Sequence, residues 1–302
     1  MIIAEDVTRR FGDRIAVENL SLEIAEGEVF GFLGPNGAGK TTTVRMLAGL
    51  LAPSAGRAIV AGVDVCADPH RVRALVGLLP EHPGLYEKLS AWHNLKFYGD
   101  LYDLPKAEAH IEKYLNLLGL WERRFEPVGT FSKGMKQKLA IARALLHEPR
   151  VLFLDEPTSG LDPEAAKTVR DFIAQLASEK RTIFLCTHNL YEAEQLCTRI
   201  GLMRQRLIRI GSPTSLKREL YGRQIVIDLQ EPLAISEDLN LPFVRSVQKD
   251  GRRLFVELDD PEQHNPALIK RLVELGAQIQ FVREQDRTLE EVYLELISEE
   301  QR

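Results

Sequence analysis

The chain carries the segment Gly34-Pro35-Asn36-Gly37-Ala38-Gly39-Lys40-Thr41, from which the local fold can be inferred. It fits the pattern G-x-x-x-x-G-K-[ST], whose glycines let successive backbone N–H groups point inward and cradle an anion. A short apolar run, 29–33, precedes it, as expected for a buried strand, and residues 40–51 have helical character. Strand, glycine-rich loop and helix in this order predict a loop that binds the phosphates of ATP or GTP.

The residues after the glycines are suited to separate tasks on a nucleotide. The helix presents its positive N-terminus to the phosphates. Lys40 supplies a positive charge to the β and γ phosphates, and Thr42 can reach an inner phosphate. The Thr41 hydroxyl is placed to bind Mg²⁺. We therefore expect ATP and Mg²⁺ as the cofactors.

A pair of acids follows a second apolar run. The segment Val151-Leu152-Phe153-Leu154-Asp155-Glu156 predicts a buried strand that ends in two carboxylates. Ligands of open α/β sheets bind at this strand edge, so Asp155 is a candidate to hold Mg²⁺ and Glu156 to polarise an attacking water. Two solvated acids at a strand end would look the same in isolation, and the phosphate loop favours the catalytic interpretation.

His188 follows a third apolar run, 182–186. A lone histidine at a strand end is usually structural or solvated. The next parallel strand would also place it near a γ-phosphate, so the residues alone leave both interpretations open.

The order of elements predicts an α/β fold for the first 220 residues. Short apolar strands alternate with helices over this range, which is typical of a parallel sheet. Strands and turns are expected for residues 1–30, and helical periodicity from Ser90 to Gly119, continued by a helix at 133–147, predicts a helical subdomain at about 90–150. The character changes near residue 220, and we expect residues 223–302 to form a small α+β domain. In it Pro266 begins a helix and Thr288-Leu289-Glu290-Glu291 is a capping box.

Composition limits the location and the partners. The net charge of −5 gives no global basic field for nucleic acid, so no nucleic-acid partner is expected. The three cysteines match no zinc spacing. No run approaches the roughly 18 apolar residues that cross a bilayer, and the N-terminus lacks the basic region of a signal peptide. We expect a cytoplasmic protein that reaches a membrane only through a partner.

Taken together, these residues resemble the nucleotide-binding subunit of an ATP-binding cassette (ABC) transporter, over about residues 1–220. The stretch Phe131-Ser132-Lys133-Gly134-Met135-Lys136-Gln137-Lys138 resembles the signature of that family. The resemblance implies that Ser132 and Gly134 touch the γ-phosphate held by the opposite subunit, and an anion at a helix N-terminus makes physical sense. It also implies an ABC cassette with an antiparallel β subdomain and a helical subdomain.

Further positions match the family. Ser159-Gly160-Leu161-Asp162 resembles its D-loop, at the dimer interface, and His188 falls at its switch histidine. Phe11 falls where the family has an aromatic ring that stacks on adenine, and a phenylalanine in the core is the alternative. The resemblance implies a head-to-tail dimer with two shared ATP sites.

Two departures from the family pattern concern the same site. Glu81 stands where the Q-loop usually has glutamine; a glutamate can still ligate Mg²⁺ but adds negative charge beside phosphates. Lys133 replaces the first glycine of the signature, and Met135 replaces its final glutamine.

The C-terminal ending and the segment Pro83-Gly84-Leu85-Tyr86-Glu87-Lys88-Leu89-Ser90 are similar to the ABC-2 type subfamily, which pairs such ATPases with separate membrane permeases, typically for export. The implied function is an ATPase that drives such a permease from the cytoplasmic face of the membrane. The alternative is an ABC ATPase of translation or DNA repair, but those chains typically carry two cassettes, long coiled coils or zinc insertions.

Overall fold

The computed structural model describes residues 1–302 except 222, 233–240, 286–287, 292 and 294–302. The chain divides into two compact units, Met1–Ser212 and Pro213–Arg302. The division therefore falls before the helix at 213–221, whereas the expected boundary lay near residue 220.

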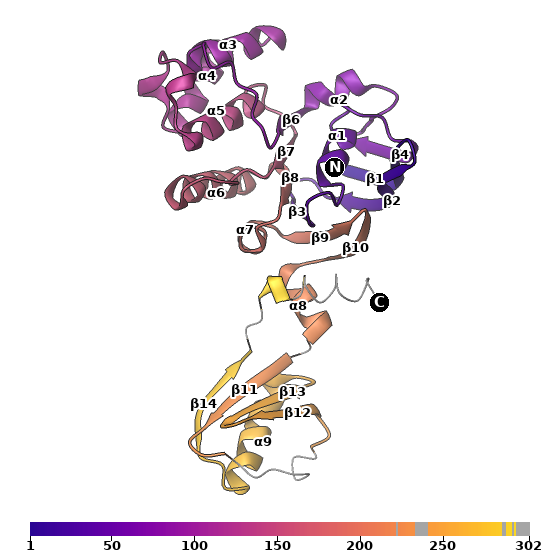
Figure 1. Ribbon diagram of the computed structural model, residues 1–302, viewed down its shortest axis with the longest axis vertical. Coiled ribbons are helices and arrows are strands. Elements are labelled where there is room, and N and C mark those ends of the chain that lie inside the picture. Colours follow the sequence, from indigo (N-terminus) through magenta and orange to yellow (C-terminus); the bar gives the residue numbers. More distant parts are fainter. Residues whose placement is uncertain (222, 233–240, 286–287, 292, 294–302) are drawn as a thin grey trace. The chain divides into compact units, whose positions relative to one another are not determined.

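The first unit contains a six-stranded sheet in the order β10-β9-β3-β8-β7-β6 (Figure 1). Its inner strands run parallel, and β10 pairs antiparallel with β9 at one edge. The strands are β3 (Val29–Leu33), β6 (Val76–Leu79), β7 (Val151–Asp155), β8 (Thr182–Thr187), β9 (Arg199–Arg204) and β10 (Arg206–Gly211). Every residue of β3, β7 and β8 is buried, as the continuous apolar runs predicted.

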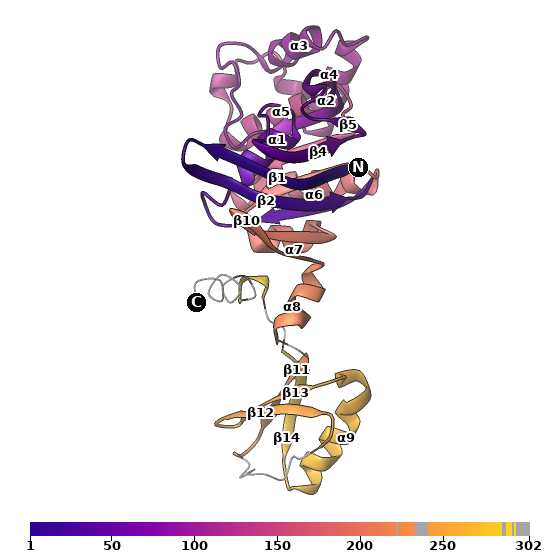
Figure 2. The same cartoon turned by 90° about the vertical axis from the view of Figure 1, so that its right-hand side faces the viewer.

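A second, antiparallel sheet has the order β2-β1-β4-β5. Its strands are β1 (Ile2–Phe11), β2 (Arg14–Ile24), β4 (Ala55–Val60) and β5 (Val63–Asp64). Ile2, Val7 and Leu20 of this sheet share one apolar core with Phe30 and Phe32 of the six-stranded sheet. The antiparallel β subdomain, whose strands are labelled in Figure 2, is thus joined to the parallel sheet by a common core.

The first unit also contains helices. They are α1 (Lys40–Leu47), α2 (Pro69–Leu75), α3 (Ala91–Leu101), α4 (Ala107–Leu117), α5 (Lys133–Leu145), α6 (Pro163–Ser178) and α7 (Leu190–Leu196), with short 3₁₀ turns at Trp121–Arg123 and Val128–Thr130. Helices α3, α4 and α5 form a group of their own, the predicted helical subdomain (Figure 1). Helix α1 ends four residues earlier than expected, because Gly49 takes the left-handed conformation just after the Ala48 cap.

The second unit is an antiparallel sheet with the order β12-β13-β11-β14 and one helix packed on it. It comprises α8 (Pro213–Tyr221), β11 (Arg223–Leu229), β12 (Val244–Asp250), β13 (Arg253–Leu258), α9 (Pro261–Glu274) and β14 (Ile279–Glu284). The expected start of α9 at Pro266 is wrong: the helix begins at Pro261, after the Asp260 cap, and Pro266 lies inside it. The capping box is present, because Thr288 and Glu291 exchange hydrogen bonds between side chain and backbone N–H.

Candidate functional site

The carboxyl ends of three neighbouring strands meet at one cavity of about 540 Å³. Strand β3 leads into the phosphate loop, β7 ends at Asp155, and β8, which lies between them, is followed by His188. The cavity is lined by residues 35–42 and by Phe11, Glu81, Asp155, Glu156 and His188. Parallel pairing therefore brings together residues that are more than a hundred positions apart, at the edge where open sheets bind ligands.

Glycines are required in the phosphate loop by both conformation and space. Gly37 and Gly39 have φ values of +81° and +101°, which L side chains rarely adopt. A Cβ on Gly39 would lie 2.4 Å from the carbonyl oxygen of Ala16, and one on Gly34 would lie 2.3 Å from that of Met203. Gly34 itself is not part of the cavity lining. The loop thus packs directly on the backbones of its neighbours.

Lys40 is the first residue of α1 and only 7% of its side chain is exposed. Its Nζ donates to the carbonyl oxygens of Gly34 at 2.6 Å and Pro35 at 3.3 Å. It also lies 4.0 Å from Oε1 of Glu156. These contacts hold a buried ammonium group across the mouth of the loop, where phosphate oxygens would replace them as acceptors.

Thr41 and Asp155 meet across the cavity. The Thr41 hydroxyl donates to Oδ2 of Asp155 at 2.7 Å. Burial raises the pKa of Asp155, the Thr41 hydrogen bond lowers it, and the neighbouring charges of Glu156 and Glu81 raise it. A hydroxyl and carboxylates converge here, which are the oxygen ligands that Mg²⁺ prefers. The described residues hold no group of three His, Cys, Asp or Glu side chains arranged for a metal, so phosphates and water would complete such a site.

Glu156 and His188 form the second polar pair. Nδ1 of His188 lies 2.8 Å from Oε2 of Glu156, whose side chain is 10% exposed, while His188 is 61% exposed. Glu156 has a φ of +53°, and its backbone N–H donates to the carbonyl oxygen of Cys186 on β8. The strained backbone turns the carboxylate into the cavity beside the Lys40 ammonium.

A buried residue that the sequence analysis did not single out supports the segment around His188. Glu192 is fully buried, accepts a hydrogen bond from the Thr187 hydroxyl at 2.9 Å, and sits on α7, which is capped by Asn189. Burial raises the pKa of Glu192, against the Thr187 and Thr158 hydrogen bonds that lower it. A glutamate on a short helix gives no sequence signal for such a contact.

Phe11 lies at the end of β1 and is 47% exposed, so it is not a core residue. The Arg9 guanidinium stacks over its ring at 4.6 Å. Arg14, its cross-strand partner, and Ala16 also line the cavity, and both were missed by the sequence analysis. The glycine at position 12 was a sequence signal for a turn between β1 and β2, which brings Arg14 and Ala16 beside Phe11.

Ser132 and Gly134 lie outside this cavity. Ser132 caps α5, with its Oγ accepting from the Met135 N–H at 3.3 Å. Gly134 is buried, and a Cβ there would lie 2.8 Å from Cβ of Ala165. Of the residues predicted for this chain's own part of the site, all line the cavity except Gly34; Ser132 and Gly134 were expected to serve the opposite subunit's site.

Comparison with known proteins extends this picture. Residues 17–159 match the family described as ABC transporter, and residues 211–297 match the C-terminal domain of DrrA1-3-like ATP-binding proteins. The chain is 37% identical to the daunorubicin resistance ATP-binding protein DrrA3 of Streptomyces coeruleorubidus, over 100% of this chain and 97% of that protein. The chain belongs to the ABC transporter family of ATP-binding proteins.

Other relatives agree with this assignment. The ABC subunit is 36% identical to the Nod factor export ATP-binding protein I of Rhizobium sp. (strain N33), over 97% of this chain and 96% of that protein. The solved structure of cbiO1 from Clostridium perfringens, part of the ABC transporter complex cbiONQ, is 28% identical with a TM-score of 0.66, covering 72% of this chain and 90% of that chain. ABC cassettes bind ATP and hydrolyse it to power transport, and the fold of this chain is that of a P-loop ABC cassette. In the described part of this chain, none of the helices has the length and apolar character needed to cross a bilayer.

Proposed function

We propose that two copies of this subunit, or this subunit and a paired ATPase, join head to tail around two ATP molecules and drive a separate membrane permease. One observation carries the proposal. The cavity holds the phosphate loop, Asp155, Glu156 and His188 of one chain, whereas Ser132 and Gly134 lie outside it. A second subunit would bring its own Ser132 and Gly134 to the γ-phosphate, at the N-terminus of α5, where backbone N–H groups favour an anion.

Mg²⁺ would be held by the Thr41 hydroxyl and Asp155, with Glu81 as a third oxygen ligand. These three residues line the same cavity, and Thr41 and Asp155 already contact each other. Bound there with ATP, the ion would neutralise negative charge on the phosphates. Thr42 and the loop N–H groups would bind the inner phosphates, and Phe11 would stack on the adenine.

In hydrolysis the chain's own residues act mainly by position and charge. Glu156 orients and polarises the attacking water. The His188 side chain, whose Nδ1 lies 2.8 Å from Oε2 of Glu156, contacts the γ-phosphate. Lys40 offers its ammonium to the β and γ phosphates, exchanging the carbonyl oxygens of Gly34 and Pro35 for phosphate oxygens. Hydrolysis removes the tetra-anionic contact that joins the two subunits, and the pair opens.

The transport direction we propose is export. The Streptomyces relative is named for daunorubicin resistance and the Rhizobium relative for Nod factor export. The cbiO1 structure is titled as part of a larger transporter complex. By this analogy the subunit works at the cytoplasmic face of the membrane, bound to its permease.

Glu156→Gln tests the catalytic assignment. The change keeps the size of the side chain and removes its charge, so ATP still binds while steady-state hydrolysis falls by ~100-fold or more, as expected for loss of a general base. Hydrolysis at a near-normal rate in this variant would overturn the role of Glu156. Glu194→Gln, a change on α7 outside the cavity lining, serves as the control and leaves the rate close to wild type.

A further inference from the structure

Helix α5 contacts the loop 156–161, which follows β7, at two points. The side-chain amide of Gln137 donates to the carbonyl oxygen of Pro157 at 2.8 Å, and this contact is buried. One turn earlier, the ammonium of Lys133 lies where a side chain on residue 160 would stand: a Cβ built on Gly160 would be 2.1 Å from Nζ. Residues four apart share one face of a helix, so Lys133 and Gln137 contact the loop together.

The loop that they contact begins with Glu156. The Ser159 N–H donates to the Glu156 carbonyl oxygen at 3.2 Å, and the Leu161 N–H donates to that of Thr158 at 3.2 Å, so the loop is a compact turn. Ser159 lines the nucleotide cavity. A shift of this turn would therefore move both Glu156 and Ser159.

A second cavity, of about 350 Å³, lies between α5 and the loop 156–161. Lys133, Gln137, Ser159 and Glu81 all line it, and Ser159 and Glu81 also line the nucleotide cavity. Within the part of the chain that the structure describes, no carboxylate forms an ion pair with Lys133, although Lys136 on the same helix is paired with Glu87 at 2.6 Å. The Lys133 ammonium thus lies beside Gly160 of the loop, and Lys133 and Glu81 line the same cavity.

We propose that Lys133 and Gln137 are positioning residues, which hold the loop 156–161 so that Glu156 points correctly into the nucleotide cavity. If the composite site proposed above is correct, α5 has two roles. Ser132 and Gly134 at its N-terminus complete the site of the opposite subunit, and Lys133 and Gln137 set the catalytic carboxylate of its own subunit.

The contact predicts a specific kinetic effect. Lys133→Met and Gln137→Leu lower kcat for ATP hydrolysis by roughly tenfold, because small displacements of catalytic groups are costly, while KM for ATP changes by less than about twofold. Lys167→Met removes a cation from an exposed position on α6 that lines neither cavity, and it leaves both parameters near wild type. Lys133 is exposed, so its replacement does not threaten folding.

A double-mutant cycle isolates the contact with Gly160. Gly160→Ala introduces strain at φ +63° in any background, but it displaces the ammonium only when Lys133 is present. We expect the loss of kcat from Gly160→Ala to be at least about threefold smaller in the Lys133→Ala background than in the wild type. Strict additivity would contradict the contact.

Hydrogen exchange of the segment 156–161 in the nucleotide-free full chain separates this inference from the proposed function. Exchange there accelerates in Lys133→Met and Gln137→Leu but not in Lys167→Met, whether or not the chain hydrolyses ATP. Unchanged exchange and unchanged kcat in both variants would overturn the positioning role. A wild-type chain without ATPase activity would refute the proposed function alone, and the exchange result would still decide the positioning role.

Discussion

The hydroxyl of Thr41 donates a hydrogen bond of 2.7 Å to Oδ2 of Asp155, although 114 positions separate the two residues. The contact joins the first turn of α1 to the end of β7, two strands away from the strand that precedes the phosphate loop. It links the loop that binds phosphates to the carboxylate pair, and the proposed Mg²⁺ site lies at this junction.

Thr41→Ala tests the Mg²⁺ assignment. Loss of the hydroxyl removes one oxygen ligand and releases Asp155, so the Mg²⁺ concentration for half-maximal ATPase activity rises by roughly tenfold or more. Thr41→Ser keeps the hydroxyl as an oxygen ligand and therefore leaves the Mg²⁺ requirement within about threefold of wild type. A titration of activity against Mg²⁺ at saturating ATP measures both, and an equal requirement in the alanine variant would count against Thr41 as a ligand.

Two glycines of the phosphate loop provide a matched pair. Both have positive φ, but only Gly39 lacks space: its Cβ would lie 2.4 Å from the Ala16 carbonyl oxygen, whereas nothing lies within 4 Å of a Cβ on Gly37. Gly37→Ala should cost about 1 kcal/mol of backbone strain, and Gly39→Ala should cost more and weaken nucleotide binding further. Binding of a fluorescent ATP analogue and urea unfolding of both variants measure the difference; equal losses would show that the close packing has no effect.

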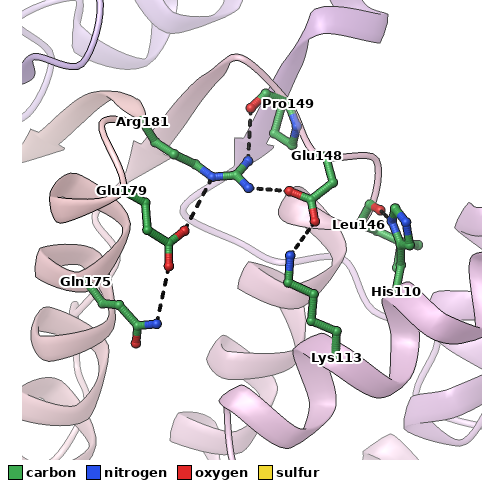
Figure 3. Close-up of polar contacts among 8 residues, drawn as sticks. All are labelled: His110, Lys113, Leu146, Glu148, Pro149, Gln175, Glu179 and Arg181. Atoms are coloured by element: carbon green, nitrogen blue, oxygen red, sulfur yellow. Dashed lines mark hydrogen bonds and ion pairs between the residues drawn. The ribbon is translucent and has the colours of Figure 1, made fainter.

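A charged cluster joins the helical subdomain to the sheet (Figure 3). Oε1 of Glu148 lies 2.6 Å from Nζ of Lys113 on α4, and its other oxygen pairs with Arg181, just before β8. Arg181 also donates to the Pro149 carbonyl oxygen at 3.2 Å. Burial raises the pKa of Glu148, but the hydrogen bonds from Lys113 and Arg181 outweigh it and lower the pKa to about 2.

Because the pKa of Glu148 is lowered in the folded state, its ionised carboxylate stabilises the fold. Glu148 stabilises the fold above its ordinary value of 4.5, and this contribution is lost as the pH falls from 4.5 toward 2. Glu148→Gln should lower the free energy of unfolding at pH 7 by roughly 1–2 kcal/mol, a figure reduced for solvent screening of the partly exposed carboxylate. The difference from wild type should narrow below about pH 4.5.

Urea unfolding at several pH values measures this difference. The exposed pair of Arg123 and Glu126, three residues apart, supplies the control, because Glu126→Gln removes only a local surface contact and should have the smaller effect. If the free energy of unfolding of Glu148→Gln differed from that of wild type by the same amount at every pH, the charge of Glu148 would be excluded as the cause of the stabilisation.

Local sequence patterns predicted most residues of the site. The remaining residues reach it through contacts between distant segments, which such patterns do not reveal. The phosphate loop, the strand 29–33 and the acids after residue 154 could be recognised because each signal lies within a few adjacent residues. Arg14 and Ala16 reach the cavity through the β1–β2 hairpin, and Gln137 reaches Pro157 across two elements, so no short window reveals them. The start of α9 was missed because Pro266 looks like a first-turn residue, although the Asp260 cap begins the helix five residues earlier than expected.

The mass of the Glu156→Gln chain with and without Mg-ATP tests whether two subunits share the ATP site. Sedimentation velocity should show a monomer or weak dimer without nucleotide and a stable dimer with ATP. Adding Ser132→Arg, a change outside the chain's own cavity, should abolish the dimer while ATP still binds. An unchanged mass on addition of ATP, or an ATP dimer that persists with Ser132→Arg, would contradict a site completed by the second subunit.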